Sequence, residues 1–248
     1  MPQFSARVVG AGAQGYSNTD PTNVNLGILL PLGTIVEGTD GRAWRWCKAG
    51  TSDLVAGNTI QSSAIITAHL ANTPPVTAIG ATSFSYTPGA TAGAANLYAE
   101  GYLQVDTAPG NGYTYQVSGH AAITASTAFT LYLMPKDPLQ IAISATSRVG
   151  LVAHPYQNVI QFPATTATGT LVGVAPYIIT AAYNGWLQTY GACSVLQSDT
   201  TAAGLSMGAP SGTAGATVAY AAATTTLLGN MMQLAASAKN NFVYLRIG

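Results

Sequence analysis

Apolar and polar residues alternate with a period of two along much of the chain, which is the pattern of half-buried β-strands. The clearest case consists of two extended runs, Thr34–Gly38 and Arg42–Lys48, joined by Thr39-Asp40-Gly41. Asp-Gly between such runs predicts a tight hairpin, because glycine accepts the positive φ that the turn requires. Trp44 and Trp46 lie two residues apart in the second run and therefore share one face of the strand.

Short runs of the same kind recur up to the C-terminus, rich in β-branched and aromatic residues and bounded by Gly, Pro, Asn or Asp. Thr59–Leu70 fits either a strand or a short helix, and Asn230–Ala238 alone favours a helix of one or two turns. Many short strands with frequent turns predict an all-β protein built as a sandwich or a barrel. The remaining predicted strands are Val76–Tyr86, Thr114–Val117, Thr127–Met134, Leu139–Ser144, Arg148–Ala153, Val159–Phe162, Leu171–Val174, Ile178–Tyr183, Gly185–Tyr190 and Phe242–Ile247.

Residues 1–32 differ from the rest, because they are rich in Gly, Asn, Thr and Pro and hold little that could be buried. We expect an extended N-terminal arm that becomes ordered on a partner or a neighbouring subunit. Arg7, Val8 and Val9 are its expected anchors, since they form the only charged or β-branched cluster before Asp20.

Beyond the arm we expect two regions, a hairpin-containing N-terminal β-domain at 33–95 and a β-rich C-terminal region at 96–248. Within the second, Glu100–Val105 (EGYLQV) and Asn184–Thr189 (NGWLQT) share Gly-aromatic-Leu-Gln at a spacing of 84 residues. That spacing suits a duplicated small β-domain rather than a solenoid and would divide the region into 96–175 and 176–248. The shared motif is short, so a single C-terminal region remains the alternative.

The composition is poor in charge: 6% of residues are charged, against about 25% in an average soluble protein. A net charge of zero argues against binding to nucleic acid or to an anionic membrane. Two interpretations stay open: a surface largely covered by a partner, or a Thr, Ser, Asn and Gln surface that hydrogen-bonds to water. Because 48% of residues are hydrophobic, we also expect self-association, with a trimer favoured.

Cys47 and Cys193 are too few for a disulfide framework or a zinc cluster, so we expect two buried, reduced thiols. The segment Met1–Arg7 lacks the basic-then-apolar order of a signal peptide. No apolar run approaches the roughly 18 residues that span a bilayer. The expectation is therefore a soluble protein that is not exported by the usual route.

No catalytic signature emerges from the sequence. The three histidines, His69, His120 and His154, are far apart, so a metal site is not expected. Glu37 and Glu100 could form a glycosidase pair, although only their neighbouring glycines suggest it. The GAGAQG run at 10–15 loosely fits a dinucleotide-binding loop, but no helical pattern follows it. We therefore expect a protein that is not an enzyme and binds no cofactor.

Several stretches resemble capsid decoration (cement) proteins of tailed bacteriophages. They are the hairpin stretch LGTIVEGTDGRAWRWCKAG at 32–50, LVAGNTIQ at 54–61, NGWLQTYGACSVL at 184–196 and FVYLRIG at 242–248. The resemblance implies a β-rich protein that binds and strengthens the outside of an icosahedral shell, commonly as a trimer. Its partner would be the major capsid protein, and it would be made in the host cytoplasm and reside on the virion.

Trp44 and Trp46 join Arg7, Val8 and Val9 as candidate interaction residues, because no other segment combines aromatic mass and charge as densely as the hairpin. Two other classes remain open. One is a different virion component from the tail, neck or head fibre. The other is a carbohydrate-binding β-domain, disfavoured by the lack of a signal peptide and by the unpaired cysteines.

Overall fold

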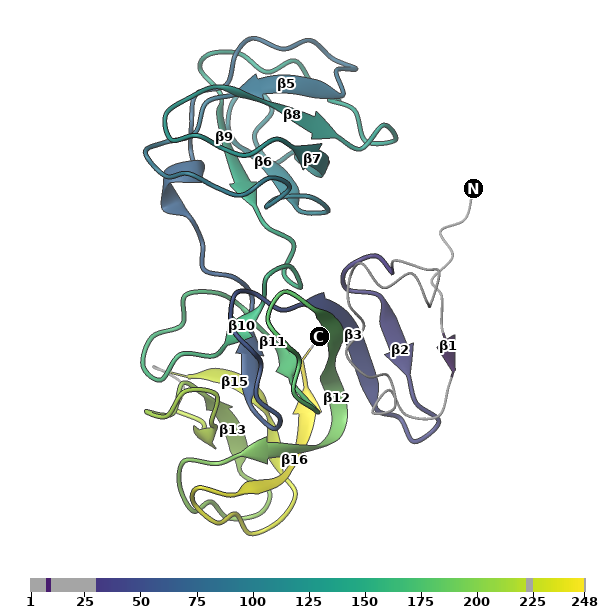
Figure 1. Cartoon of the computed structure of the whole chain (residues 1–248), viewed down its shortest axis with the longest axis vertical. Helices are drawn as coiled ribbons and strands as arrows, with labels where there is room; N and C mark the ends of the chain where they lie inside the picture. The colour runs from purple at the N-terminus through teal and green to yellow at the C-terminus, as the bar shows by residue number, and fades with distance from the viewer. Residues whose placement is uncertain (1–7, 10–29, 222–224, 248) are drawn as a thin grey trace. The chain divides into compact units, whose positions relative to one another are not determined.

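The structure of the chain is a computed structural model that describes residues 8–9, 30–221 and 225–247 (Figure 1). In these residues the regular structure is β apart from one 3-10 turn, η3 (Thr67–His69), which confirms the predicted all-β class. The described residues contain no helix long and apolar enough to cross a membrane. The strands form an eleven-stranded and a five-stranded sheet.

The chain divides into two compact units, and one is inserted into the other. Unit 1 contains the chain up to Ser63 and again from Pro155 onward, whereas unit 2 is the continuous segment Ala64–His154. These boundaries differ from the expected divisions after residues 32, 95 and 175. Local composition suggested those divisions, but strand pairing between distant segments decides which residues form one unit.

Unit 1 is built on the eleven-stranded sheet, which is antiparallel except where its first strand joins the edge in parallel. Its main path runs β1-β2-β3-β12-β16-β15-β13-β14, and three further strands attach beside β12. The strands of the path, in that order, are β1 (Val8–Val9), β2 (Ile35–Glu37), β3 (Ala43–Lys48), β12 (Asn184–Leu196), β16 (Asn240–Arg246), β15 (Thr226–Met231), β13 (Ser206–Ala209) and β14 (Val218–Ala219). The additional strands are β4 (Thr59–Gln61), β10 (Ile160–Gln161) and β11 (Leu171–Val174).

The long strand β12 connects the two halves of this sheet. Its first half pairs with β3 and its second half with β16, and the register shifts between Gln188 and Tyr190. A bulge of this kind bends a strand and increases its twist. One strand can therefore contribute to two separate apolar clusters, with Leu187 in one and Cys193 in the other.

Both ends of the insertion are held by adjacent strands of unit 1. The chain leaves through β4 and returns through β10, and these two strands pair with Ile160 opposite Gln61. A whole domain can be inserted at such a place, because its two ends are already close together.

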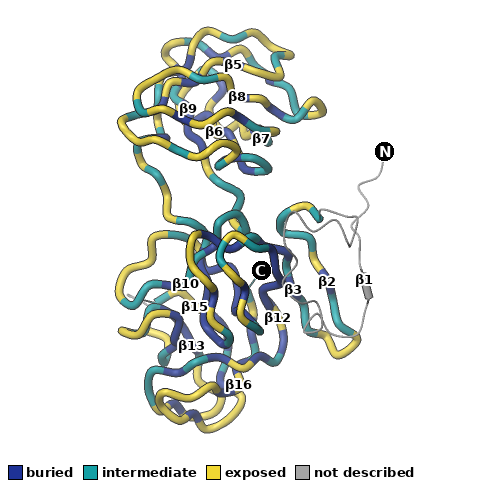
Figure 2. The backbone as a smooth tube through the Cα atoms, viewed as in Figure 1, coloured by how far each residue is buried: buried dark blue, intermediate teal, exposed yellow. Residues whose placement is uncertain are grey.

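Unit 2 contains the second sheet, in the order β5-β8-β7-β6-β9. All of its pairings are antiparallel, and its strands have one face toward the core (Figure 2). The strands are β5 (Ser83–Tyr86), β8 (Phe129–Leu133), β7 (Thr114–His120), β6 (Tyr102–Thr107) and β9 (Arg148–Val152). The core consists of Phe84, Tyr86, Tyr98, Leu103, Val105, Tyr115, Val117, Ile123, Leu131, Leu133, Leu139, Ile143, Val149 and Leu151.

The predicted hairpin is confirmed. β2 and β3 pair antiparallel with Ile35 opposite Arg45 and Glu37 opposite Ala43, and Gly41 has a φ of +80°. The predicted strands Leu139–Ser144 and Ile178–Tyr183 are wrong, because each forms only a single isolated bridge.

The predicted helix Asn230–Ala238 is also wrong. Its first residues belong to β15, where a Cβ at Gly229 would lie only 2.0 Å from the carbonyl oxygen of Tyr244 on β16. Such close backbone pairing outweighs a weak local helix preference.

The two copies of the Gly-aromatic-Leu-Gln motif fall in β6 of unit 2 and β12 of unit 1, so they do not mark adjacent sub-domains.

Replacing Gly41 with Val tests the hairpin turn. No atom lies within 4 Å of the position that a Cβ would take, so the cost arises from the positive φ alone. A β-branched residue there should lower the free energy of unfolding by about 1–3 kcal/mol. Gly41→Asn is the control, because asparagine tolerates this region, and it should remain close to the original protein in a urea titration. Equal stability of the Val and Asn variants would contradict the turn.

Candidate functional site

The three tryptophans of the protein lie together in unit 1. Trp44 and Trp46 of β3 share a face, as their spacing predicts, and pack with Trp186 of β12, Val36 and the partly buried Leu30. Trp46 lies opposite Trp186 in the sheet, and the rings meet edge to face with centroids 4.9 Å apart. This geometry is favourable for aromatic pairs and adds to the large apolar area that the rings bury.

Burial removes both hairpin tryptophans from the candidate contact surface. Trp44 is 0% exposed and Trp46 9% exposed. Among the described residues, neither indole N–H has an acceptor, so apolar packing accounts for their position. The Arg42 guanidinium lies 5.0 Å from the Trp44 ring and pairs with Asp40 at 2.6 Å. The hydrogen bonds that Asp40 accepts, first from the backbone N–H of Arg42 and then from its guanidinium, lower the pKa of this carboxyl group. We assign Trp44 and Trp46 to the core.

The other predicted anchors belong to the arm. Val8 and Val9 form β1, which pairs in parallel with β2, with Val8 opposite Val36 and Val9 opposite Glu37. This part of the arm therefore adds a strand to a sheet edge within the chain itself. Arg7 lies outside the described residues.

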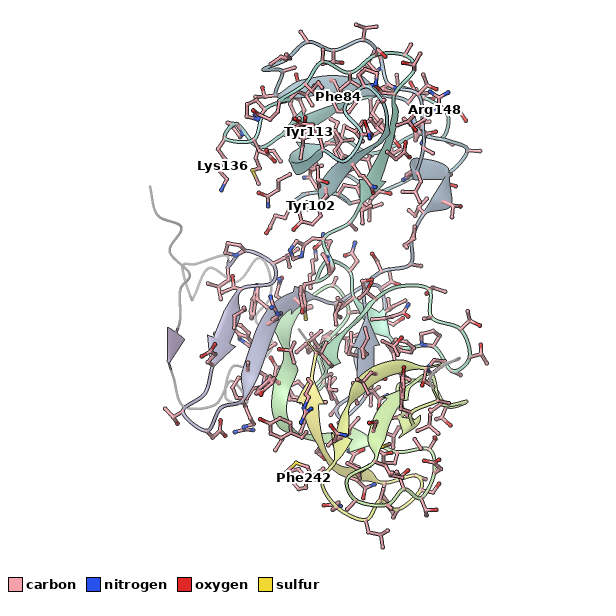
Figure 3. The ribbon with its side chains drawn as sticks, turned by 180° about the vertical axis from the view of Figure 1, so that it is seen from behind. Phe84, Tyr102, Tyr113, Lys136, Arg148 and Phe242 are labelled. Carbon is pink, nitrogen blue, oxygen red and sulfur yellow. The ribbon has the colours of Figure 1, made fainter. Side chains whose placement is uncertain are left out.

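A different part of unit 1 presents aromatic side chains to the solvent. Along β16 the residues alternate, with Val243 and Leu245 fully buried and Phe242 51% exposed on the opposite side. Phe242 is labelled in Figure 3. The register places Tyr244 opposite Ala192 and brings Tyr190 opposite Arg246.

These side chains form one continuous surface. The Tyr190 and Tyr244 rings meet edge to face at 5.5 Å, and the Arg246 guanidinium lies 5.9 Å from the Tyr244 ring. Met232, half exposed, lies beside Phe242, because its amide donates to the Phe242 carbonyl at 2.9 Å. We call this surface the aromatic face and define it as Tyr190, Met232, Phe242, Tyr244 and Arg246.

The aromatic face was missed in the sequence, although a signal for it was present. The alternation in FVYLR separates Phe242 and Tyr244 from Val243 and Leu245, but it does not show which set faces the core. An open hollow of about 300 Å³ adjoins the face at Tyr190. It is lined by Ile35, Glu37, Gly41, Ala43, Arg45, Thr189 and Tyr190.

Glu37 in this hollow belongs to unit 1 and Glu100 to unit 2, so the two carboxylates that could have formed a glycosidase pair are not part of one folded unit. The described residues hold no group of three or more His, Cys, Asp or Glu side chains that could bind a metal ion.

Cys47 and Cys193 are free and buried, as expected, and burial raises the pKa of the Cys193 thiol to about 12. A thiol with such a pKa stays protonated and unreactive near neutral pH.

Unit 2 brings together two histidines that the sequence analysis treated as isolated. His69 and His120 both contact Tyr98, and each imidazole centroid lies 5.6 Å from the centroid of the tyrosine ring. His154 lies apart from them and stacks on Tyr102 at 6.3 Å. Residues 51 positions apart gave no local signal of this contact.

Comparison of the chain with models of protein families, with curated protein sequences and with solved structures finds no match.

The free energy of unfolding of two variants distinguishes the core role of the tryptophans from the surface role of the aromatic face. Trp44→Ala should lower the free energy of unfolding by about 3–5 kcal/mol, because it leaves a large cavity in a packed cluster. Phe242→Ala should lower it by no more than about 1 kcal/mol, since half of the ring already faces water. Urea titrations followed by circular dichroism measure both values. A larger loss for Phe242→Ala would show that the two sites have been assigned the wrong way round.

Proposed function

We propose that the protein is a structural component of a virion, a decoration protein that binds the outside of an icosahedral phage capsid and strengthens it. The observation that carries the proposal is the aromatic face of unit 1. It projects one phenylalanine, two tyrosines, a methionine and an arginine from neighbouring strands of a rigid sheet. Aromatic residues, methionine and arginine are the types enriched where proteins contact one another.

Two further properties support the proposal. The resemblance of the hairpin stretch and of the 184–196 and 242–248 segments to decoration proteins includes the strands β12 and β16, which carry most of this face. In addition, a chain with 6% charged residues has few groups that would need to lose water when its surface is covered. We infer that the major capsid protein is the partner and that the protein associates as a trimer.

The composition of the aromatic face also favours one kind of contact. Arg246 is its only charged residue, so binding would rest on apolar area and neutral hydrogen bonds rather than on ion pairs. Attachment to the shell should therefore change little between about 50 mM and about 500 mM salt, whereas a contact between charged surfaces would weaken steeply.

The test uses shells assembled from the major capsid protein of the same phage, which are mixed with the purified protein and sedimented. The unaltered protein should sediment with the shells and raise the temperature at which they disassemble. Phe242→Ser should weaken binding at least tenfold, because exposed aromatic residues at such surfaces often contribute more than about 1.4 kcal/mol. Val55→Ser is the matched control, since Val55 is 47% exposed in unit 1 but lies outside the aromatic face.

Three outcomes separate the claims. If the unaltered protein does not bind shells and is absent from purified virions, the proposed function is wrong. If it is found in the tail or neck of the virion instead, the alternative virion role replaces it. If Phe242→Ser binds as well as Val55→Ser, the aromatic face is not the contact.

A further inference from the structure

The buried cluster of His69, Tyr98 and His120 in unit 2 engages both nitrogens of each imidazole in hydrogen bonds. We call it the histidine cluster. His69 is 0% exposed, and its Nε2 lies 2.8 Å from the carbonyl oxygen of Thr91. A carbonyl oxygen can only accept, so Nε2 carries a proton, and Nδ1 is hydrogen-bonded to the Tyr98 hydroxyl group.

His120 has the opposite tautomer. Its Nε2 lies 3.1 Å from the backbone nitrogen of Tyr98, whose N–H donates to it. Its Nδ1 carries the proton and donates to the Ala121 carbonyl oxygen at 2.6 Å. The His120 ring is therefore neutral, and both rings use both of their nitrogens in hydrogen bonds.

The cluster joins segments that are distant in the sequence. The Tyr86 hydroxyl group donates to the His69 carbonyl at 2.6 Å and accepts from Asn72 at 2.8 Å. At the other end of the cluster, the His120 amide donates to the Asn96 side chain at 3.0 Å, and the His120 ring packs on Phe129 at 5.3 Å. The turn at 67–72, the loop at 91–98 and the end of β7 are thus held by one set of hydrogen bonds.

A proton added to the His120 ring has no acceptor ready for it. It would go to Nε2, which faces the donating N–H of Tyr98, so two donors would oppose each other. Among the described residues that hydrogen-bond to these rings or pack on them, none carries a carboxylate; they are Tyr98, Thr91, Ala121, Phe129 and, across the cluster, the other histidine.

We propose that the histidine cluster is an acid-sensitive latch: protonation of the His120 imidazole releases the 67–72 turn and the 91–98 loop and loosens unit 2, while unit 1 stays folded. The pieces that the cluster joins belong to unit 2 alone. This inference is independent of the function proposed above and holds for the protein in any location.

The direction of the pH dependence follows from His120. Burial lowers the pKa of this imidazole below its usual value near 6.5, and the neighbouring His69 lowers it further, against the opposing effect of the bond to Ala121. A histidine whose pKa is lower in the folded state stabilises the protein fully above about pH 6.5. That stability is lost progressively as the pH falls from about 6.5 to the lowered folded-state value.

Hydrogen exchange of the full chain, followed by mass spectrometry at about pH 7.5 and about pH 5.5, tests the latch. Labelling times are scaled for the pH dependence of chemical exchange, and peptides from β3 and β12 serve as the internal reference. Peptides covering 67–72, 91–98 and 117–121 should lose protection at least tenfold relative to this reference at the lower pH. Tryptophan fluorescence should not change, because all three tryptophans lie in unit 1.

Two histidine variants, one within the histidine cluster and one outside it, test whether His120 causes the acid response. His120→Gln removes a titrating group and keeps a side chain that can both donate and accept, so its protection should no longer depend on pH. His154→Gln should retain the full acid response, since His154 stacks on Tyr102 outside the cluster. If His120→Gln does not fold, the NMR titration of the His120 ring in the unaltered protein decides instead: it should stay neutral below about pH 6.5.

The proposal is overturned if both units lose protection in parallel, if neither does, or if His154→Gln rather than His120→Gln abolishes the response. A His120 ring that titrates at its usual pKa would overturn it as well.

Discussion

The pairing of β3 with β12 is the contact on which unit 1 depends. It joins residues 43–48 to residues 184–190, with the whole of unit 2 lying between them in the sequence. The Trp46–Trp186 contact and the fully buried Trp44 lie on one side of this pairing, and Cys47 and Leu187 pack into another apolar cluster. Closing so long a loop costs entropy, so the aromatic area buried at this one contact has to offset it.

The arrangement separates the roles of the two units. Unit 1 receives its stability from segments at both ends of the chain and exposes the aromatic face on β12 and β16, which belong to the same sheet as the tryptophans. Unit 2 is a continuous segment with its own core and its own buried polar cluster. The proposed contact surface therefore lies on unit 1, and the proposed acid response lies in unit 2.

The sequence predicted local features well and distant ones poorly. The hairpin at Gly41 was predicted correctly, because the turn chemistry and the alternation lie within a few residues. The aromatic mass of Trp44 and Trp46 was recognised, but its burial was not, because that depends on Trp186, which lies 140 residues away. The same limit explains why the end of β15 and the residues that follow it were taken for a helix, and why His69 and His120 were treated as isolated.

Removing unit 2 tests the account most directly. If residues 64–154 are replaced by a short flexible linker, the paired ends of β4 and β10 should still meet and β3 should still find β12. The account predicts that the shortened chain unfolds in a single cooperative transition, with tryptophan emission at the short wavelengths of buried indoles before it. Emission of solvent-exposed tryptophan and unfolding without a cooperative transition would show that unit 1 does not exist apart from its insertion.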